Sequence, residues 1–214
     1  MLVEKRVPAF ATDGGASDYY EQRAPEYDDW YRGAGVFRGR ERPGWEGDVE
    51  RLVEFVTGLE PARTLDVACG TGFLTRHLCG LVVGLDQSPT MVRIAQSRLP
   101  AGVAIVGDAL ALPFAGGAFE RVFTGHFYGH LPPDERARFL SEARRVASEL
   151  IVVDSAPRPD RPPEHWDRRV LNDGSEHTVY KRYLSADQLA QEIGGRPAFE
   201  GRWFVAAVAG DGIN

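Results

Sequence analysis

Two closely spaced glycines, Gly70 and Gly72, follow a run of apolar and β-branched residues at positions 64–69. A short helical pattern begins just beyond them, with Leu74 and Leu78 one turn apart. A strand, a glycine turn and a helix in this order bring backbone N–H groups against a nucleotide-like ligand. Because many turns contain such a glycine pair, the residues downstream decide whether this turn binds a ligand.

Acidic residues close the next two apolar runs. Asp86 ends the run at 81–85, and Asp108 follows the run at 103–106 after a single glycine. A carboxylate just past the C-terminal end of a parallel strand points into the crevice where open α/β sheets bind ligands. We therefore expect Asp86 to hold a ribose diol and Asp108 to accept a hydrogen bond from an adenine amino group. Taken singly, either aspartate also fits a solvated loop or a helix cap.

A resemblance to a known family rests on four motifs, which read DVACGTG at 66–72, GLDQS at 84–88, GDA at 107–109 and LPF at 112–114. Together they resemble the class I S-adenosylmethionine-dependent methyltransferases, in the small-molecule branch that includes the ubiquinone and menaquinone biosynthesis enzymes. The similarity extends over residues 18–156, with a looser likeness in the C-terminal third. It implies S-adenosylmethionine as the cofactor and a small molecule as the methyl acceptor.

The resemblance also assigns site residues. It implies that Asp66 orders the turn near the amino-acid end of the cofactor, and that the aromatic N-terminal segment is a lid. Aromatic faces near a sulfonium offer a cation–π attraction of roughly 0.5–2 kcal/mol, so we expect Tyr20 and Tyr27 to close the site. The full set of expected cofactor-binding residues is Tyr20, Tyr27, Asp66, Ala68, Gly70, Gly72, Asp86, Gln87, Met91, Asp108 and Ala109.

Methyl transfer from a sulfonium is an in-line displacement, so the protein mainly positions the acceptor and excludes water. It requires no metal and no covalent intermediate, and a base only if the acceptor is a hydroxyl or a carbon acid. His126, just after the fourth predicted strand, is the expected base, and Tyr128, His130 and Trp166 are the expected substrate contacts. His130 also fits a structural role in the turn that follows it.

Alternative functions have distinct sequence requirements. A nicotinamide-binding domain needs a third glycine where this chain has Thr75, and it has no counterpart of Asp66. A protein that binds the cofactor without catalysis would keep Asp86 but lack an acceptor pocket. Aminopropyl transfer would require an acidic pair for polyamine cations, and none is obvious. Two departures from the methyltransferase pattern, Ala68 for its first glycine and Glu120 for an aspartate, are not taken as loss of activity.

Composition limits the partners. With 25 Lys and Arg against 31 Asp and Glu, the chain has a formal charge of −6 and no basic stretch, which argues against binding nucleic acid. No apolar run is long enough to span a bilayer. The two cysteines have neither metal-ligand nor disulfide-framework spacing, so we expect a cytoplasmic protein. Monomer and homodimer both remain open.

Strand and helix patterns alternate along the 214 residues, which predicts an α/β fold with a mostly parallel sheet and helices on both faces. The resemblance adds a single Rossmann-like domain with seven strands, an N-terminal helical lid, and a last strand inserted antiparallel between the fourth and the fifth. We expect a lid and flexible loop at 1–45, a cofactor-binding core at 46–156, and a substrate-side loop with C-terminal elements at 157–214. The segment at 157–178 lacks periodicity and is expected to be an irregular mobile cover.

Overall fold

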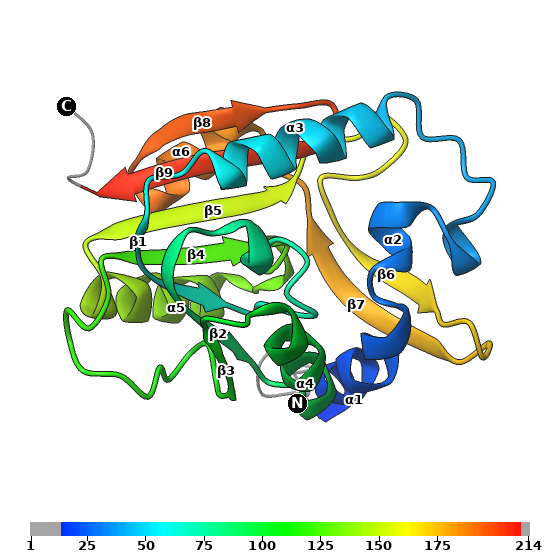
Figure 1. The fold of residues 1–214 in the computed structure, drawn as a ribbon. Helices are drawn as coiled ribbons and strands as arrows, with labels where there is room; N and C mark the ends of the chain where they lie inside the picture. Colours follow the sequence, from blue (N-terminus) through cyan, green and yellow to red (C-terminus); the bar gives the residue numbers. More distant parts are fainter. Residues whose placement is uncertain (1–13, 211–214) are drawn as a thin grey trace, which may run out of the picture.

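A seven-stranded sheet forms the centre of the molecule (Figure 1). The structure is a computed structural model that describes residues 14–210, so the outer ends of the predicted lid and C-terminal part lie outside it. The strand order is β3-β2-β1-β4-β5-β9-β8. The strands are β1 (Ala62–Val67), β2 (Gly80–Asp86), β3 (Val103–Val106), β4 (Arg121–Gly125), β5 (Glu149–Ser155), β8 (Arg196–Glu200) and β9 (Phe204–Gly210). This confirms the predicted Rossmann-like α/β fold.

The first five strands run parallel, and β9 is antiparallel to both of its neighbours. The expected antiparallel last strand is therefore present, but its predicted place was wrong: β4 pairs directly with β5, and β9 lies between β5 and β8. Strand β8 was not predicted, because it begins Arg-Pro and has no apolar run.

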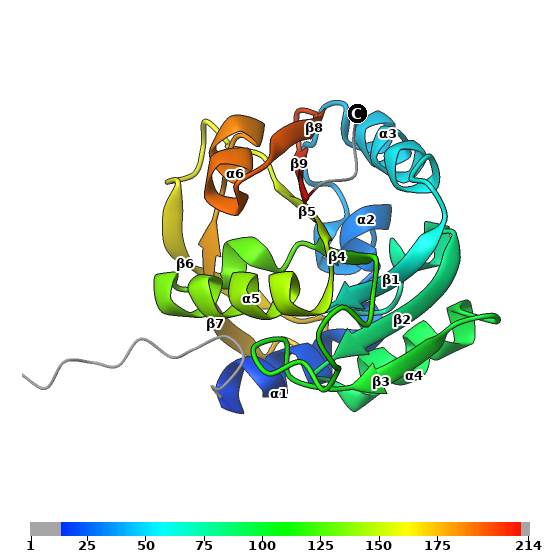
Figure 2. The same cartoon turned by 90° about the vertical axis from the view of Figure 1, so that its left-hand side faces the viewer.

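Helices cover both faces of the sheet, as Figure 2 shows, with α5 and α6 on one side and α3 and α4 on the other. Alternate residues of each strand face opposite sides. On β5, Val152 packs against the α5 and α6 side, whereas Ile151 and Val153 pack against the α3 side. The main helices are α3 (Trp45–Thr57), α4 (Pro89–Arg98), α5 (Pro133–Val146) and α6 (Ala186–Ile193).

The helix starts predicted from local capping residues are confirmed for α4 and α6. The Ser88 hydroxyl caps α4 by accepting from the Met91 amide, and Ser185 with Gln188 forms the expected capping box of α6. The helix expected after Gly72 is shorter than predicted. Only a 3-10 turn, η3 (Thr75–His77), lies there, because β2 already begins at Gly80.

A second layer covers the carboxyl ends of the parallel strands. Its N-terminal part is helical and breaks near Pro25, as expected. The prediction of an irregular segment at 157–178 was wrong, because most of it belongs to an antiparallel hairpin that packs against α1. The elements of this layer are α1 (Gly14–Arg23), η1 (Ala24–Glu26), α2 (Asp29–Arg32), η2 (Gly35–Phe37), β6 (Glu164–Val170) and β7 (Glu176–Arg182).

Candidate functional site

A pocket lies at the carboxyl ends of β1, β2, β3 and β4, and we call it the strand-end pocket. It encloses about 540 Å³ of space, including its open mouth. A parallel sheet places its ligand site at this edge. Nine of the residues expected to bind the cofactor line the pocket: Tyr20, Tyr27, Ala68, Gly70, Asp86, Gln87, Met91, Asp108 and Ala109.

Asp86 holds the glycine turn in place. Its carboxylate accepts hydrogen bonds from the backbone N–H groups of Gly70 and Ser88, each at 2.9 Å. Burial raises the pKa of Asp86 to about 6, although these N–H groups oppose the shift. Each carboxylate oxygen has a second lone pair, so the group can still accept from a ligand in the pocket.

The two glycines of the turn have different surroundings. Gly70 has φ +54°, lines the strand-end pocket, and would place a Cβ 3.5 Å from the Tyr27 ring. Gly72 has φ +76°, and its Cβ would come within 3.2 Å of the backbone of Ala95 in α4. Gly72 is not among the lining residues, so its position serves the packing of α4 against the turn.

Asp66 lies behind the turn, beside a smaller pocket that Ala68 and Tyr27 also line. One carboxylate oxygen accepts from the Thr75 hydroxyl at 2.6 Å, and the other has no hydrogen-bond partner among the described residues. Burial raises the pKa of Asp66 to about 8. At this pKa the side chain is largely protonated at pH 7, and a cationic group placed beside the unsatisfied oxygen would favour its ionised form.

The N-terminal helices are attached to the core through polar contacts near the strand-end pocket. The Glu21 carboxylate accepts from the hydroxyl groups of Ser88 and Thr90 at the start of α4. Asp28 accepts from the Thr71 hydroxyl at 2.6 Å and from Arg98 at 2.7 Å. These contacts hold Tyr20 and Tyr27 against the strand-end pocket, which both residues line. Whether this segment opens and closes as a lid stays a prediction.

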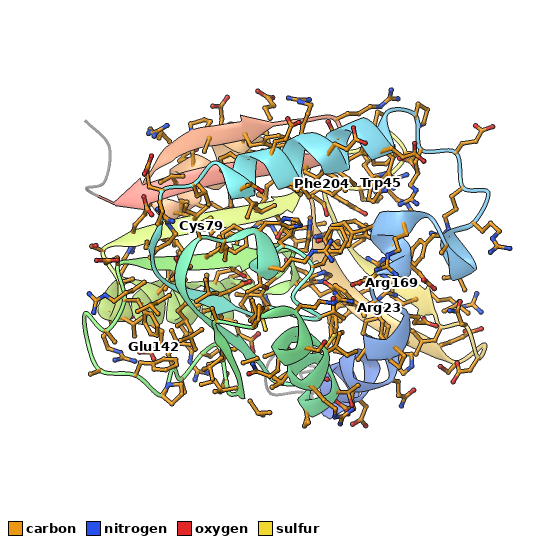
Figure 3. All side chains as sticks on the ribbon, viewed as in Figure 1. Arg23, Trp45, Cys79, Glu142, Arg169 and Phe204 are labelled. Carbon is orange, nitrogen blue, oxygen red and sulfur yellow. The ribbon has the colours of Figure 1, made fainter. Side chains whose placement is uncertain are left out.

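A larger hollow opens between the N-terminal helices and the β6–β7 hairpin, and we call it the arginine pocket. It encloses about 1100 Å³, including its open mouth. Figure 3 labels Arg23 and Arg169, two of its cationic lining residues, where the N-terminal helices face the hairpin. Its cationic lining residues are Arg23, Arg40, Arg42, Arg158, Arg161, Arg169 and Lys181.

The two pockets share three lining residues, Tyr20, Tyr27 and His126. His126 is buried, and its φ of +61° is uncommon for a residue with a side chain. Neither ring nitrogen has a hydrogen-bond partner in the described part of the chain, and the Trp30 ring lies 4.8 Å away edge-on. Burial lowers the pKa of His126 to about 4, so the ring is neutral at pH 7. The unusual backbone conformation of His126 and its two unsatisfied ring nitrogens, at the boundary of two pockets, indicate that this side chain contacts a ligand.

A buried ion pair supports the floor of the arginine pocket. The Lys181 ammonium on β7 lies 2.6 Å from a carboxylate oxygen of Asp154 at the end of β5. Asp154 also accepts from the backbone N–H groups of Gly129 and Ser155. Burial opposes ionisation of Asp154, but the Lys181 ammonium overcomes it and the pKa falls to about 2. This pair could not be predicted from the sequence, because its members are 27 positions apart.

The expected substrate contacts lie in three different places. His130 lines the arginine pocket, where its Nδ1 lies 2.6 Å from the Tyr180 carbonyl oxygen. Tyr128 is buried in the core, where its hydroxyl donates to Glu192 at 3.0 Å, and it lines neither pocket. Trp166 is 45% exposed on the outer face of the hairpin and lines neither pocket.

Comparison with known proteins agrees with this geometry. Residues 64–149 match the family described as a methyltransferase domain. The chain is similar to the demethylmenaquinone methyltransferase of Thermotoga maritima, with 35% identity over 116 residues, 50% of each protein. It is also similar to the 2-methyl-6-phytyl-1,4-hydroquinone methyltransferase of Synechocystis sp., with 31% identity over 157 residues, 67% of this chain and 49% of that one. The chain spans about half the length of these curated relatives.

A likeness to a solved structure covers more of the chain. The structure described as the DhpI-SAM-HEP complex has a TM-score of 0.69 and 26% sequence identity, over 91% of this chain and 95% of that one. The resemblance seen in the motifs is thus confirmed, and this chain carries a methyltransferase domain with the class I S-adenosylmethionine-dependent fold.

Proposed function

We propose that this protein transfers a methyl group from S-adenosylmethionine, bound in the strand-end pocket, to a small molecule bound in the arginine pocket. The observation that carries the proposal is the wall that the two pockets share. Tyr20, Tyr27 and His126 line both of them, so a group presented at this wall is accessible from either side. A protein that only binds the cofactor would not need the second pocket.

The residues of the strand-end pocket fit the cofactor. Asp86 offers carboxylate oxygens for ribose hydroxyls, and Asp108 offers an acceptor on the adjacent strand. The unsatisfied oxygen of Asp66 suits the ammonium of the amino-acid end. Gly70 leaves room that a side chain would fill toward Tyr27. When bound, S-adenosylmethionine would supply a methyl group on a sulfonium: the acceptor atom would bond to the methyl carbon as the carbon–sulfur bond breaks in line, and S-adenosylhomocysteine would leave.

The shared wall then performs four tasks. The aromatic rings of Tyr20 and Tyr27 exclude water and present π faces to positive charge. His126 orients the acceptor through a ring nitrogen. Because its imidazole is neutral at pH 7, it also accepts a proton if the acceptor atom carries one.

Calorimetric titration tests the proposed function. We expect S-adenosylmethionine and S-adenosylhomocysteine to bind with one site per chain, and NAD not to bind. Incubation with methyl-labelled cofactor and candidate acceptors should then release S-adenosylhomocysteine only when an acceptor is methylated. Binding of NAD in preference to S-adenosylhomocysteine would contradict the proposal.

A pair of glycine substitutions separates binding from packing. Gly70→Val should abolish S-adenosylhomocysteine binding, because a β-branched side chain at φ +54° is strained and extends toward Tyr27 in the pocket. Gly72→Val should instead lower the melting temperature most, because its Cβ meets the backbone of α4. Calorimetry and thermal unfolding of both variants check this. If Gly70→Val binds normally and only loses stability, the turn is purely structural.

A further inference from the structure

The arginine pocket differs sharply in charge from the rest of the molecule. The whole chain has a formal charge of −6. Seven cationic side chains line this one hollow, against only two acidic ones, Glu41 and Asp167. Four of the cations have carboxylate partners: Arg158 pairs with Asp160, Arg161 and Arg169 pair with Asp167, and Lys181 pairs with Asp154.

The other three cations have no carboxylate partner within residues 14–210: Arg23, Arg40 and Arg42. Aromatic rings and neutral oxygens hold them instead. The Arg42 guanidinium lies 3.9 Å from the Trp45 ring centroid, and that of Arg40 lies 4.7 Å from the Phe37 ring centroid. An arginine held by stacking keeps donor N–H groups free for an oxyanion.

The cations that line the arginine pocket come from segments far apart in the sequence. Arg23 ends α1, Arg40 and Arg42 lie between η2 and α3, and Arg169 lies on β6. Burial lowers the pKa of Arg40, and the charges of Arg169 and Arg161 lower it further. Gathering like charges in a partly desolvated hollow is unfavourable, and a bound anion would relieve the repulsion.

We propose that the methyl acceptor is a small molecule bearing a multiply charged oxyanion, either a phosphate group or several carboxylates, which Arg23, Arg40 and Arg42 bind. This inference rests on the proposed function, because it names the substrate class of the same site. An uncharged apolar acceptor would leave all three guanidinium groups without a counter-charge in a pocket where Arg23 is buried and Arg42 half-buried, which is costly. A single carboxylate would neutralise only one of them.

Inorganic phosphate, citrate and acetate are suitable probes, titrated into the protein with and without saturating S-adenosylhomocysteine. We expect phosphate or citrate to bind more tightly than acetate, and added sodium chloride to weaken binding. Arg40→Gln and Arg42→Gln should each weaken binding about tenfold or more, since each removes charge-assisted hydrogen bonds. Arg38→Gln is the matched control, because Arg38 is exposed on the same segment but does not line the pocket.

Three results would overturn the inference: no binding of phosphate or citrate, acetate binding equally well, or an equal loss in Arg38→Gln and Arg40→Gln. Because the anions are also titrated alone, the anion site is judged even if S-adenosylhomocysteine does not bind. Failure of S-adenosylhomocysteine to bind would count against the proposed function, whereas failure of the anions alone would leave that function standing with a different acceptor.

Discussion

Replacing Lys181 with methionine is expected to lower the free energy of unfolding by about 3–5 kcal/mol, the usual cost of breaking a buried ion pair from one side. Lys181 and Asp154 are both buried, and their charged atoms lie 2.6 Å apart. Methionine fills a similar volume but leaves the Asp154 carboxylate with only two backbone N–H donors. Urea unfolding at pH 7 measures the effect.

The double variant Asp154→Asn/Lys181→Met is expected to recover much of the lost stability, because no unpaired charge stays buried. The control is Arg168→Met, which breaks the exposed Arg168–Glu176 pair on the same hairpin and should have a much smaller effect. Equal losses of unfolding free energy in Lys181→Met and Arg168→Met would show that the buried pair stabilises the fold no more than the exposed pair does.

The Asp154–Lys181 pair also predicts how the free energy of unfolding changes at acidic pH. The pKa of Asp154 in the folded protein is about 2, below its ordinary value of 3.8. Its ionised form therefore stabilises the fold above pH 3.8, and this contribution is lost as the pH falls through about 2. Lys181→Met should move the loss to higher pH, since it removes the charge that favours ionisation.

The strand-end pocket was predictable because its residues follow local rules. The glycine turn and the aspartates at strand ends lie within short motifs, and a parallel sheet brings all strand ends to one edge. The hairpin was missed because both of its faces are polar. On β6, the residues Asp167 and Arg169 face inward, while Arg168 faces solvent, so no apolar alternation marks a strand.

The unpredicted strand β6 also explains why Trp166 does not line either pocket, although it was expected to contact the substrate. Side chains alternate along a strand, so Trp166 lies on the outer face once Asp167 and Arg169 face inward. The arginine pocket itself could not be predicted, because Arg23, Arg40 and Arg169 converge only through the tertiary fold. In the sequence they sit among carboxylates and glycines, where arginines are typical of solvated surface.

Removing the Asp86 side chain is expected to weaken S-adenosylhomocysteine binding by at least tenfold. Charge-assisted hydrogen bonds contribute roughly 1.5–3 kcal/mol each, and Asp86→Ala would lose those to the ribose as well as those to Gly70 and Ser88. Asp187→Asn, an exposed aspartate in the first turn of α6, is the control and should bind normally. Unchanged affinity in Asp86→Ala would defeat the assignment of Asp86 to the ribose.

The pH dependence of this affinity provides a sharper test. Burial raises the pKa of Asp86 to about 6. Because the ionised carboxylate is the better acceptor for hydroxyl groups, affinity should fall below pH 6 by up to about tenfold per pH unit.

The stability of the free protein should change in the opposite direction, because a raised carboxyl pKa stabilises the fold at low pH and this contribution is lost as the pH rises through 6. Asp66 titrates higher, near pH 8, so the difference between the wild type and Asp86→Asn isolates the Asp86 contribution. If both proteins show the same slope between pH 5 and 7, Asp86 does not carry the charge that the ribose contact requires.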